Sequence, residues 1–152
     1  MSFNKTQFKT VIEETLKRID KYSEKVVCLL LGTCAQESDF GTYFYQINGP
    51  ALGVFQMEPA TMRDIWCNYL NYRDNLVRSI YQACGVVDAD EFALKTNIAY
   101  QIIMARFQYY RVPEPLPTTV HGFARYWKIY YNTHKEKGIE EKFVENYNRY
   151  VL

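Results

Sequence analysis

The residue with the clearest chemical potential is Glu37, which follows the apolar run VVCLLL at positions 26–31. At about 100° per residue, Glu37 shares a helix face with Leu30 and Thr33. Partial burial and the negative end of a helix dipole both raise the pKa of a carboxyl group. A carboxyl group that keeps its proton near neutral pH can act as a general acid. The plainer interpretation, which position alone favours, is a glutamate that turns to solvent where the helix ends.

A second chemically suggestive stretch is GPALGVFQMEPATMRDIW, at residues 49–66. Gly53 permits the backbone to approach a ligand closely. Gln56 carries both a hydrogen-bond donor and an acceptor, which suits an N-acetyl group. Phe55 either lines the floor of a cleft or belongs to the core. Ser38 suits a supporting hydrogen-bond role better than a nucleophilic one, because no histidine lies near it in the sequence.

Three segments together resemble the motifs of the lytic transglycosylase and goose-type lysozyme superfamily. Glu37-Ser38 matches the Glu-Ser motif that ends a buried helix in that family. Residues 53–56, GVFQ, match its Gly-Leu-Met-Gln-like motif with conservative changes, and EPAT follows. Tyr131-Asn132 matches two residues of its Ala-Tyr-Asn motif, but the glycine that usually follows is absent. The resemblance covers about residues 23–135, so residues 1–22 and the last helix look like additions.

The resemblance implies a mainly α, lysozyme-like fold over residues 1–152 as a single catalytic domain, with at most a small β-hairpin around the active-site loop. Glu37 would protonate the β-1,4 bond between N-acetylmuramic acid and N-acetylglucosamine, through an oxocarbenium-like transition state. In a transglycosylase the same residue then acts as the base on the sugar's C6 hydroxyl, which gives a 1,6-anhydro product. The substrate-binding residues implied are Ser38, Gly53, Phe55, Gln56, Tyr131 and Asn132.

Tyr131 has a second explanation from the residues alone. It lies on one apolar stripe with Phe123 and Trp127, so helix packing accounts for it equally well.

A goose-type muramidase would need a second carboxylate to activate water, at about 6.5–9.5 Å from the first. Glu58 and Asp64 are the candidates, because Asp39 lies roughly 200° around the helix from Glu37 and faces away from it. Glu58 also suits the N-terminus of a helix without any catalytic role. The sequence therefore favours the single-glutamate transglycosylase mechanism over hydrolysis.

The elements that must position these residues are predicted from periodicity and from capping residues. Ser23 is expected to cap a helix that is buried on nearly all sides, and Pro59 fits the first turn of another. Asp88 and Glu91 form a capping-box pair for one long helix, which the proline-rich stretch VPEPLP ends. Helices are expected over residues 6–22, 23–37, 59–70, 75–84, 91–110, 119–131 and 139–150.

The composition excludes several classes of function. The net charge of +1 provides no field to recruit nucleic acid or an anionic membrane surface. No segment is long and apolar enough to insert into a membrane, and the N-terminus carries no apolar signal region. The four cysteines show no CxxC pair, so they are expected to be reduced and structural, with no metal site and no cofactor.

A peptidoglycan-cleaving domain without a signal peptide or a membrane segment is typical of bacteriophage proteins. We expect synthesis in the cytoplasm of the host bacterium, with holin-dependent release or association with the virion, and peptidoglycan glycan strands as the partner. The main rival is a non-catalytic virion structural or glycan-binding protein with the same fold. A helical interaction module in which the motifs are coincidental is a third alternative.

Overall fold

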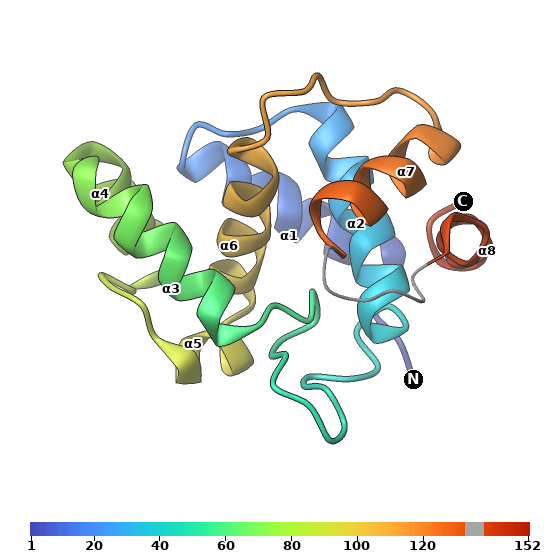
Figure 1. Ribbon diagram of the computed structural model, residues 1–152, viewed down its shortest axis with the longest axis horizontal. Helices are drawn as coiled ribbons and strands as arrows, with labels where there is room; N and C mark the ends of the chain where they lie inside the picture. The colour runs from blue at the N-terminus through green and yellow to red at the C-terminus, as the bar shows by residue number, and fades with distance from the viewer. Residues whose placement is uncertain (133–138) are drawn as a thin grey trace.

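The computed structural model describes residues 1–132 and 139–152, and these residues are mainly helical, as predicted (Figure 1). The elements, in chain order, are α1 (Lys5–Arg18), α2 (Glu24–Ser38), α3 (Pro59–Asn68), the 3-10 turn η1 (Leu70–Tyr72), α4 (Asp74–Cys84), α5 (Glu91–Thr96), α6 (Ile98–Tyr110), α7 (Val120–Tyr130) and α8 (Glu140–Tyr150). None of the described helices combines the length and the apolar composition that a membrane span requires.

The helix α2 is buried on nearly all sides, as its composition predicts. Ser23 caps its start, since the hydroxyl accepts a hydrogen bond from the Val26 N–H at 3.2 Å. Asp39 ends it by adopting a left-handed conformation, with φ at 53°. The predicted boundaries of this helix are therefore confirmed to within one residue. Glu37 lies in its last turn.

The long helix predicted over residues 91–110 is wrong, because the chain breaks at Asn97 into α5 and α6. Asn97 is extended, and its side chain accepts a hydrogen bond from the Tyr100 N–H at 3.0 Å. An asparagine competes in this way with the intrahelical bonds and starts a new helix. The expected capping residue is also different, since Asp90 and not Asp88 caps α5.

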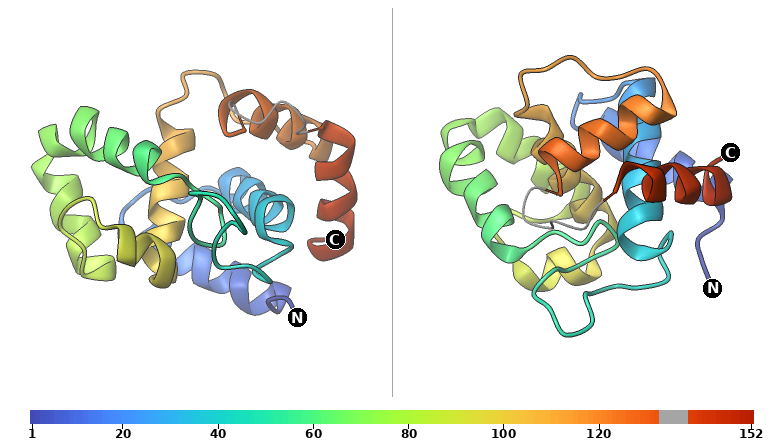
Figure 2. Two further views of the ribbon diagram at one scale, coloured as in Figure 1. Left: turned by 60° about the horizontal axis from the view of Figure 1, so that its bottom comes forward. Right: turned by 45° about the vertical axis from the view of Figure 1, so that its right-hand side comes forward.

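The first and last helices belong to the core, although they lie outside the segment that resembles the superfamily. In α1, Ile12 and Leu16 are fully buried. The helix α8 packs against both α2 and α7 (Figure 2), and its Phe143 ring lies 5.5 Å from that of Trp127. Gly32 of α2 makes this approach possible, because a β-carbon there would lie 2.5 Å from the Phe143 ring.

The segment between α2 and α3 contains no strand among the described residues. The expected hairpin is reduced to two isolated antiparallel bridges, between Tyr45 and Leu52 and between Leu52 and Met57. The loop closes on itself through Gly53, whose N–H donates to the Phe44 carbonyl at 2.7 Å. The loop thereby returns to the end of α2 and places Gln56 beside it.

Candidate functional site

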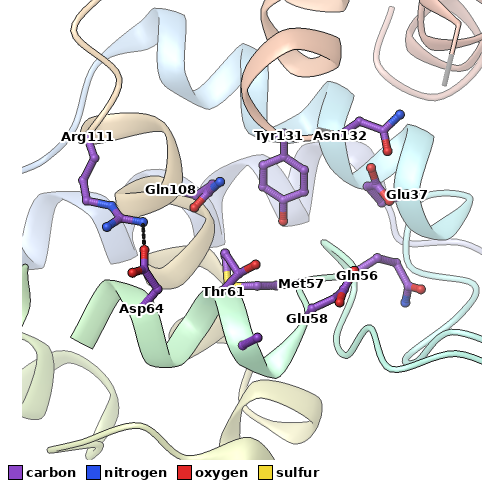
Figure 3. Close-up of a pocket in the computed structure, with 11 residues that line it drawn as sticks. Glu37, Gln56, Met57, Glu58, Thr61, Asp64, Gln108, Arg111, Tyr131 and Asn132 are labelled. Atoms are coloured by element: carbon purple, nitrogen blue, oxygen red, sulfur yellow. Dashed lines mark ion pairs between the residues drawn. The ribbon is translucent and has the colours of Figure 1, made fainter. Parts of the chain in front are cut away.

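A pocket of about 340 Å³ lies between the end of α2, the start of α3, the last turn of α6 and the residues that follow α7 (Figure 3). Its size is in the range of small-molecule sites. The lining residues are Glu37, Gln56, Met57, Glu58, Ala60, Thr61, Asp64, Gln108, Arg111, Tyr131 and Asn132. The structure therefore brings together six of the residues predicted from sequence, counting both candidates for a second carboxylate.

Glu37 is held at one end of the pocket by the core. The indole N–H of Trp127 donates to its Oε2 atom at 2.8 Å. Trp127 is 1% exposed and is packed against Phe143 of α8, so its position is fixed. The sequence pattern places Trp127 on an apolar stripe and predicts only its burial. The indole N–H was the signal that could have indicated a polar contact, because a buried indole usually finds a hydrogen-bond acceptor.

Tyr131 connects the end of α7 to the loop before α3. Its hydroxyl donates to the Phe55 carbonyl at 2.7 Å, and its ring stacks on Tyr109 with 5.2 Å between centroids. Burial, and after it the negative charge of Glu37, raises the pKa of Tyr131 well above its usual range. The phenol therefore keeps its proton at neutral pH, and this proton is the one donated to the Phe55 carbonyl. Tyr131 packs against the core, as its apolar stripe predicts, and it also lines the pocket.

Gln56 adopts a left-handed backbone conformation, with φ at 50°, at the edge of the pocket. Its Nε2 group donates to the Gly53 carbonyl at 2.8 Å, so the amide is oriented by the loop itself. Asn132 also lines the pocket and is 5% exposed.

Gly53 has a different role from the one expected, because the close approach it permits is to protein. A β-carbon at this position would lie 2.6 Å from the Leu94 carbonyl oxygen and 2.7 Å from the Gln101 side chain. The next residue, Val54, donates its N–H to Gln101 Oε1 at 3.0 Å. Gly53 therefore seats the loop against α5 and α6 and does not line the pocket.

Ser38 and Phe55 also lie behind the pocket wall. The Ser38 hydroxyl is fully buried, donating to the Cys34 carbonyl at 3.1 Å and accepting from the Gly41 N–H at 2.9 Å. The Phe55 ring is 2% exposed and stacks on Phe8. Their contacts are those of residues that support the site from behind.

The two candidates for a second carboxylate both line the pocket, but they differ in their hydrogen bonds and ion pairs. Asp64 accepts a hydrogen bond from Asn68 at 2.5 Å and pairs with Arg111 at 3.0 Å. These contacts, that of Asn68 first, lower the pKa of Asp64, which makes it a weaker base. Glu58 directly precedes α3, and its side chain makes no capping bond to that helix. Asp39 instead accepts from the Tyr150 hydroxyl, outside the pocket lining.

Metal ligands and cysteine thiols are the other side chains that could do chemistry in the described part of the chain. Among the residues that the structure describes, no group of three or more His, Cys, Asp or Glu side chains is placed to hold a metal ion. The four cysteines are free thiols.

Comparison with protein-family models, with curated proteins and with solved structures finds no significant match for the chain.

Proposed function

We propose that this protein is a peptidoglycan-degrading glycosidase with a lysozyme-like fold and with Glu37 as the general acid. The observation that carries the proposal is the placement of Glu37. It lies in the last turn of a buried helix, accepts a hydrogen bond from the Trp127 indole, and lines a pocket that Gln56 and Tyr131 also line. A carboxyl group fixed by the core in a sugar-sized pocket suits proton transfer to a glycosidic oxygen.

In the reaction we propose, Glu37 protonates the oxygen of the β-1,4 bond between N-acetylmuramic acid and N-acetylglucosamine as that bond breaks. The transition state resembles an oxocarbenium ion. Glu37, now ionised, accepts the proton of the C6 hydroxyl of the same sugar, and this oxygen bonds to the anomeric carbon. The product is a 1,6-anhydro sugar. The weakened basicity of Asp64 supports this single-glutamate route.

Hydrolysis of the same bond by a goose-type muramidase is the second candidate. Figure 3 shows Glu58 beside Gln56 and below Glu37, where the start of α3 meets the pocket. Glu58 is therefore the carboxylate that would activate water, in preference to Asp64.

A non-catalytic virion structural or glycan-binding protein remains the candidate from another class. The missing glycine after Tyr131-Asn132 favours it. The hydrogen bond from the buried Trp127 indole to Glu37 favours catalysis, because a protein with a purely structural role has no need to orient a charged group in a pocket.

The proposed partner is the glycan strand of peptidoglycan. As a bacteriophage protein, the chain would be made in the host cytoplasm and would reach the wall through a holin or as part of the virion.

The test is digestion of purified peptidoglycan by the wild-type protein and by Glu37→Gln, with the released muropeptides analysed by mass. We expect Glu37→Gln to lower the rate by about 10²–10⁴-fold with the fold retained. Products lighter by one water would identify the transglycosylase reaction, and reducing-end products the muramidase.

Glu24→Gln is the matched control, because it makes the same change at the exposed first turn of the same helix. It should leave the rate unchanged. A wild-type protein that releases no product from any wall type would contradict the proposal of catalysis.

A further inference from the structure

The end of the pocket away from Glu37 holds two polar atoms that the protein itself leaves without partners. Among the described residues, neither Gln108 Oε1 nor Arg111 Nε makes a hydrogen bond, although both atoms are buried. Both side chains line the pocket. Buried polar atoms without partners are rare in folded proteins, and each one requires an explanation.

The orientation of Gln108 is fixed by its other end. Its Nε2 group donates to the Tyr130 carbonyl at 3.3 Å. Exchanging the oxygen and nitrogen of this amide would set two acceptors against each other, so Oε1 must be the atom left over. Gln108 therefore holds an acceptor without a partner in the pocket wall, among the residues that the structure describes.

Arg111 presents a donor, and its charge is already balanced. Its Nη2 group pairs with Asp64 at 3.0 Å, while its Nε–H is the buried atom without a partner. Gln108 and Arg111 are three residues apart at the end of α6, a spacing that places side chains on one face. Figure 3 shows Gln108 between Arg111 and Tyr131.

We propose that this pair, which we call the amide subsite (Gln108 and Arg111), binds a secondary amide of the ligand. The amide carbonyl would accept from Arg111 Nε–H, and the amide N–H would donate to Gln108 Oε1. A carboxylate ligand fits less well, because Asp64 neutralises Arg111 and the Gln108 oxygen would repel a second acceptor.

The choice of ligand rests on the proposed function, since peptidoglycan offers this group in two places. One source is the N-acetyl group of the sugars, and the other is the peptide bonds of the stem attached to the muramic acid. Both present one carbonyl and one N–H side by side, so the chemistry of the subsite is the same for either.

The test measures dissociation constants by calorimetry for three probes: a chitooligosaccharide, glycan strands stripped of peptides by an amidase, and soluble strands that keep their peptides. The proteins compared carry Glu37→Gln to prevent turnover, alone or with Gln108→Leu or Arg111→Lys. Gln108→Leu removes the acceptor, and Arg111→Lys keeps the charge beside Asp64 but loses the Nε–H. Thermal unfolding verifies that each variant is folded.

We expect each added substitution to weaken binding of an amide-bearing probe about tenfold, the effect of losing one buried hydrogen bond. Arg63→Lys is the matched control, because Arg63 lies on the exposed side of α3, pairs with Glu91 and does not line the pocket. It should leave every dissociation constant unchanged.

The probes separate the two sources of the amide. A loss of affinity for the chitooligosaccharide assigns the subsite to the N-acetyl group, and a loss confined to the peptide-bearing strands assigns it to the stem. Equal affinities for all variants, or no binding of any probe, would overturn the proposal. Binding that depends on Gln108 and Arg111, without any digestion of peptidoglycan by the wild-type protein, would contradict only the proposed catalysis.

Discussion

One hydrogen bond, from the Trp127 indole to Glu37, connects the hydrophobic core to the pocket. We expect Trp127→Phe to lower the rate of peptidoglycan digestion by about 10- to 100-fold, because an ångström of displacement in a reacting group costs this much. The aromatic packing against Phe143 would persist. The measurement is the digestion rate at saturating and at limiting substrate, which should show that kcat falls more than KM rises.

Trp66→Phe provides the control for this prediction. Trp66 is equally buried, and its indole donates to the Tyr100 hydroxyl at 2.7 Å, away from the pocket lining. Both substitutions remove a buried indole bond, but only one of these bonds reaches Glu37. Equal losses of activity in the two variants would mean that Trp127 acts through stability alone.

At this scale, the sequence was informative where a residue's type and its local position decide its surroundings. Glu37 lies in the last turn of a buried helix, a position that alone favours solvent, and the resemblance of its motif is what predicted a place at a pocket. The contact of Trp127 was not predictable, because an apolar stripe predicts burial but does not tell which acceptor its N–H will meet. Gln108 and Arg111 were missed for a similar reason. Their significance depends on buried polar atoms that lack a hydrogen-bond partner among the described residues, and only the three-dimensional structure shows this.

At the scale of the elements, Gly53 determines where the loop before α3 sits. Its φ is +77°, and a β-carbon would meet the Leu94 carbonyl. We expect Gly53→Ala to destabilise the protein by about 1–3 kcal/mol more than the backbone conformation alone explains, as overpacking does. Because Gln56 bonds to the Gly53 carbonyl, activity should fall as well.

Gly85→Ala isolates the contribution of the backbone conformation. Gly85 has a similar φ of +81°, but nothing lies within 4 Å of the added β-carbon. Its expected cost is about 1–2 kcal/mol, the penalty of a left-handed conformation. Urea unfolding of the two variants gives the comparison, and equal free energies of unfolding would show that the loop yields without strain.

The predicted elements were most accurate where a cap is encoded locally. Ser23 and Pro59 mark the starts of α2 and α3 as expected. The break at Asn97 was missed because apolar periodicity continues across it, and only the side-chain bond to Tyr100 shows that a new helix begins. The motif resemblance does not extend to α1 and α8, which look like additions from it alone, yet both helices bury side chains in the core.

For the whole molecule, the buried tyrosines predict sensitivity to alkaline pH. Burial raises the pKa of Tyr100 to about 12, and it raises the pKa of Tyr109 well above the usual range. A folded-state pKa above the unfolded value of about 10 contributes stability that is complete below pH 10. This contribution is lost as pH rises through 12, about 2–3 kcal/mol for Tyr100 alone.

The measurement is urea unfolding at neutral pH and at several alkaline values, with phenolate absorbance followed in parallel. Unfolded protein in concentrated urea is the control, since all its phenols titrate near their usual pKa. A free energy of unfolding that stays constant from neutral pH to pH 12 would contradict the assignment of these phenols to the core.

Phe40, two residues after the end of α2, contacts both ends of the chain that the structure describes. Phe3 donates its N–H to the Phe40 carbonyl at 2.9 Å, and the Tyr150 ring stacks on Phe40 with 5.5 Å between centroids. Tyr150 also bonds to Asp39. During synthesis, α2 leaves the ribosome long before α8, so the last turn of α2, which holds Glu37, forms before its last neighbours are present. A nascent chain would thus carry every pocket residue before the end of α2 is fixed, and the pocket would be complete only after residue 150 has emerged.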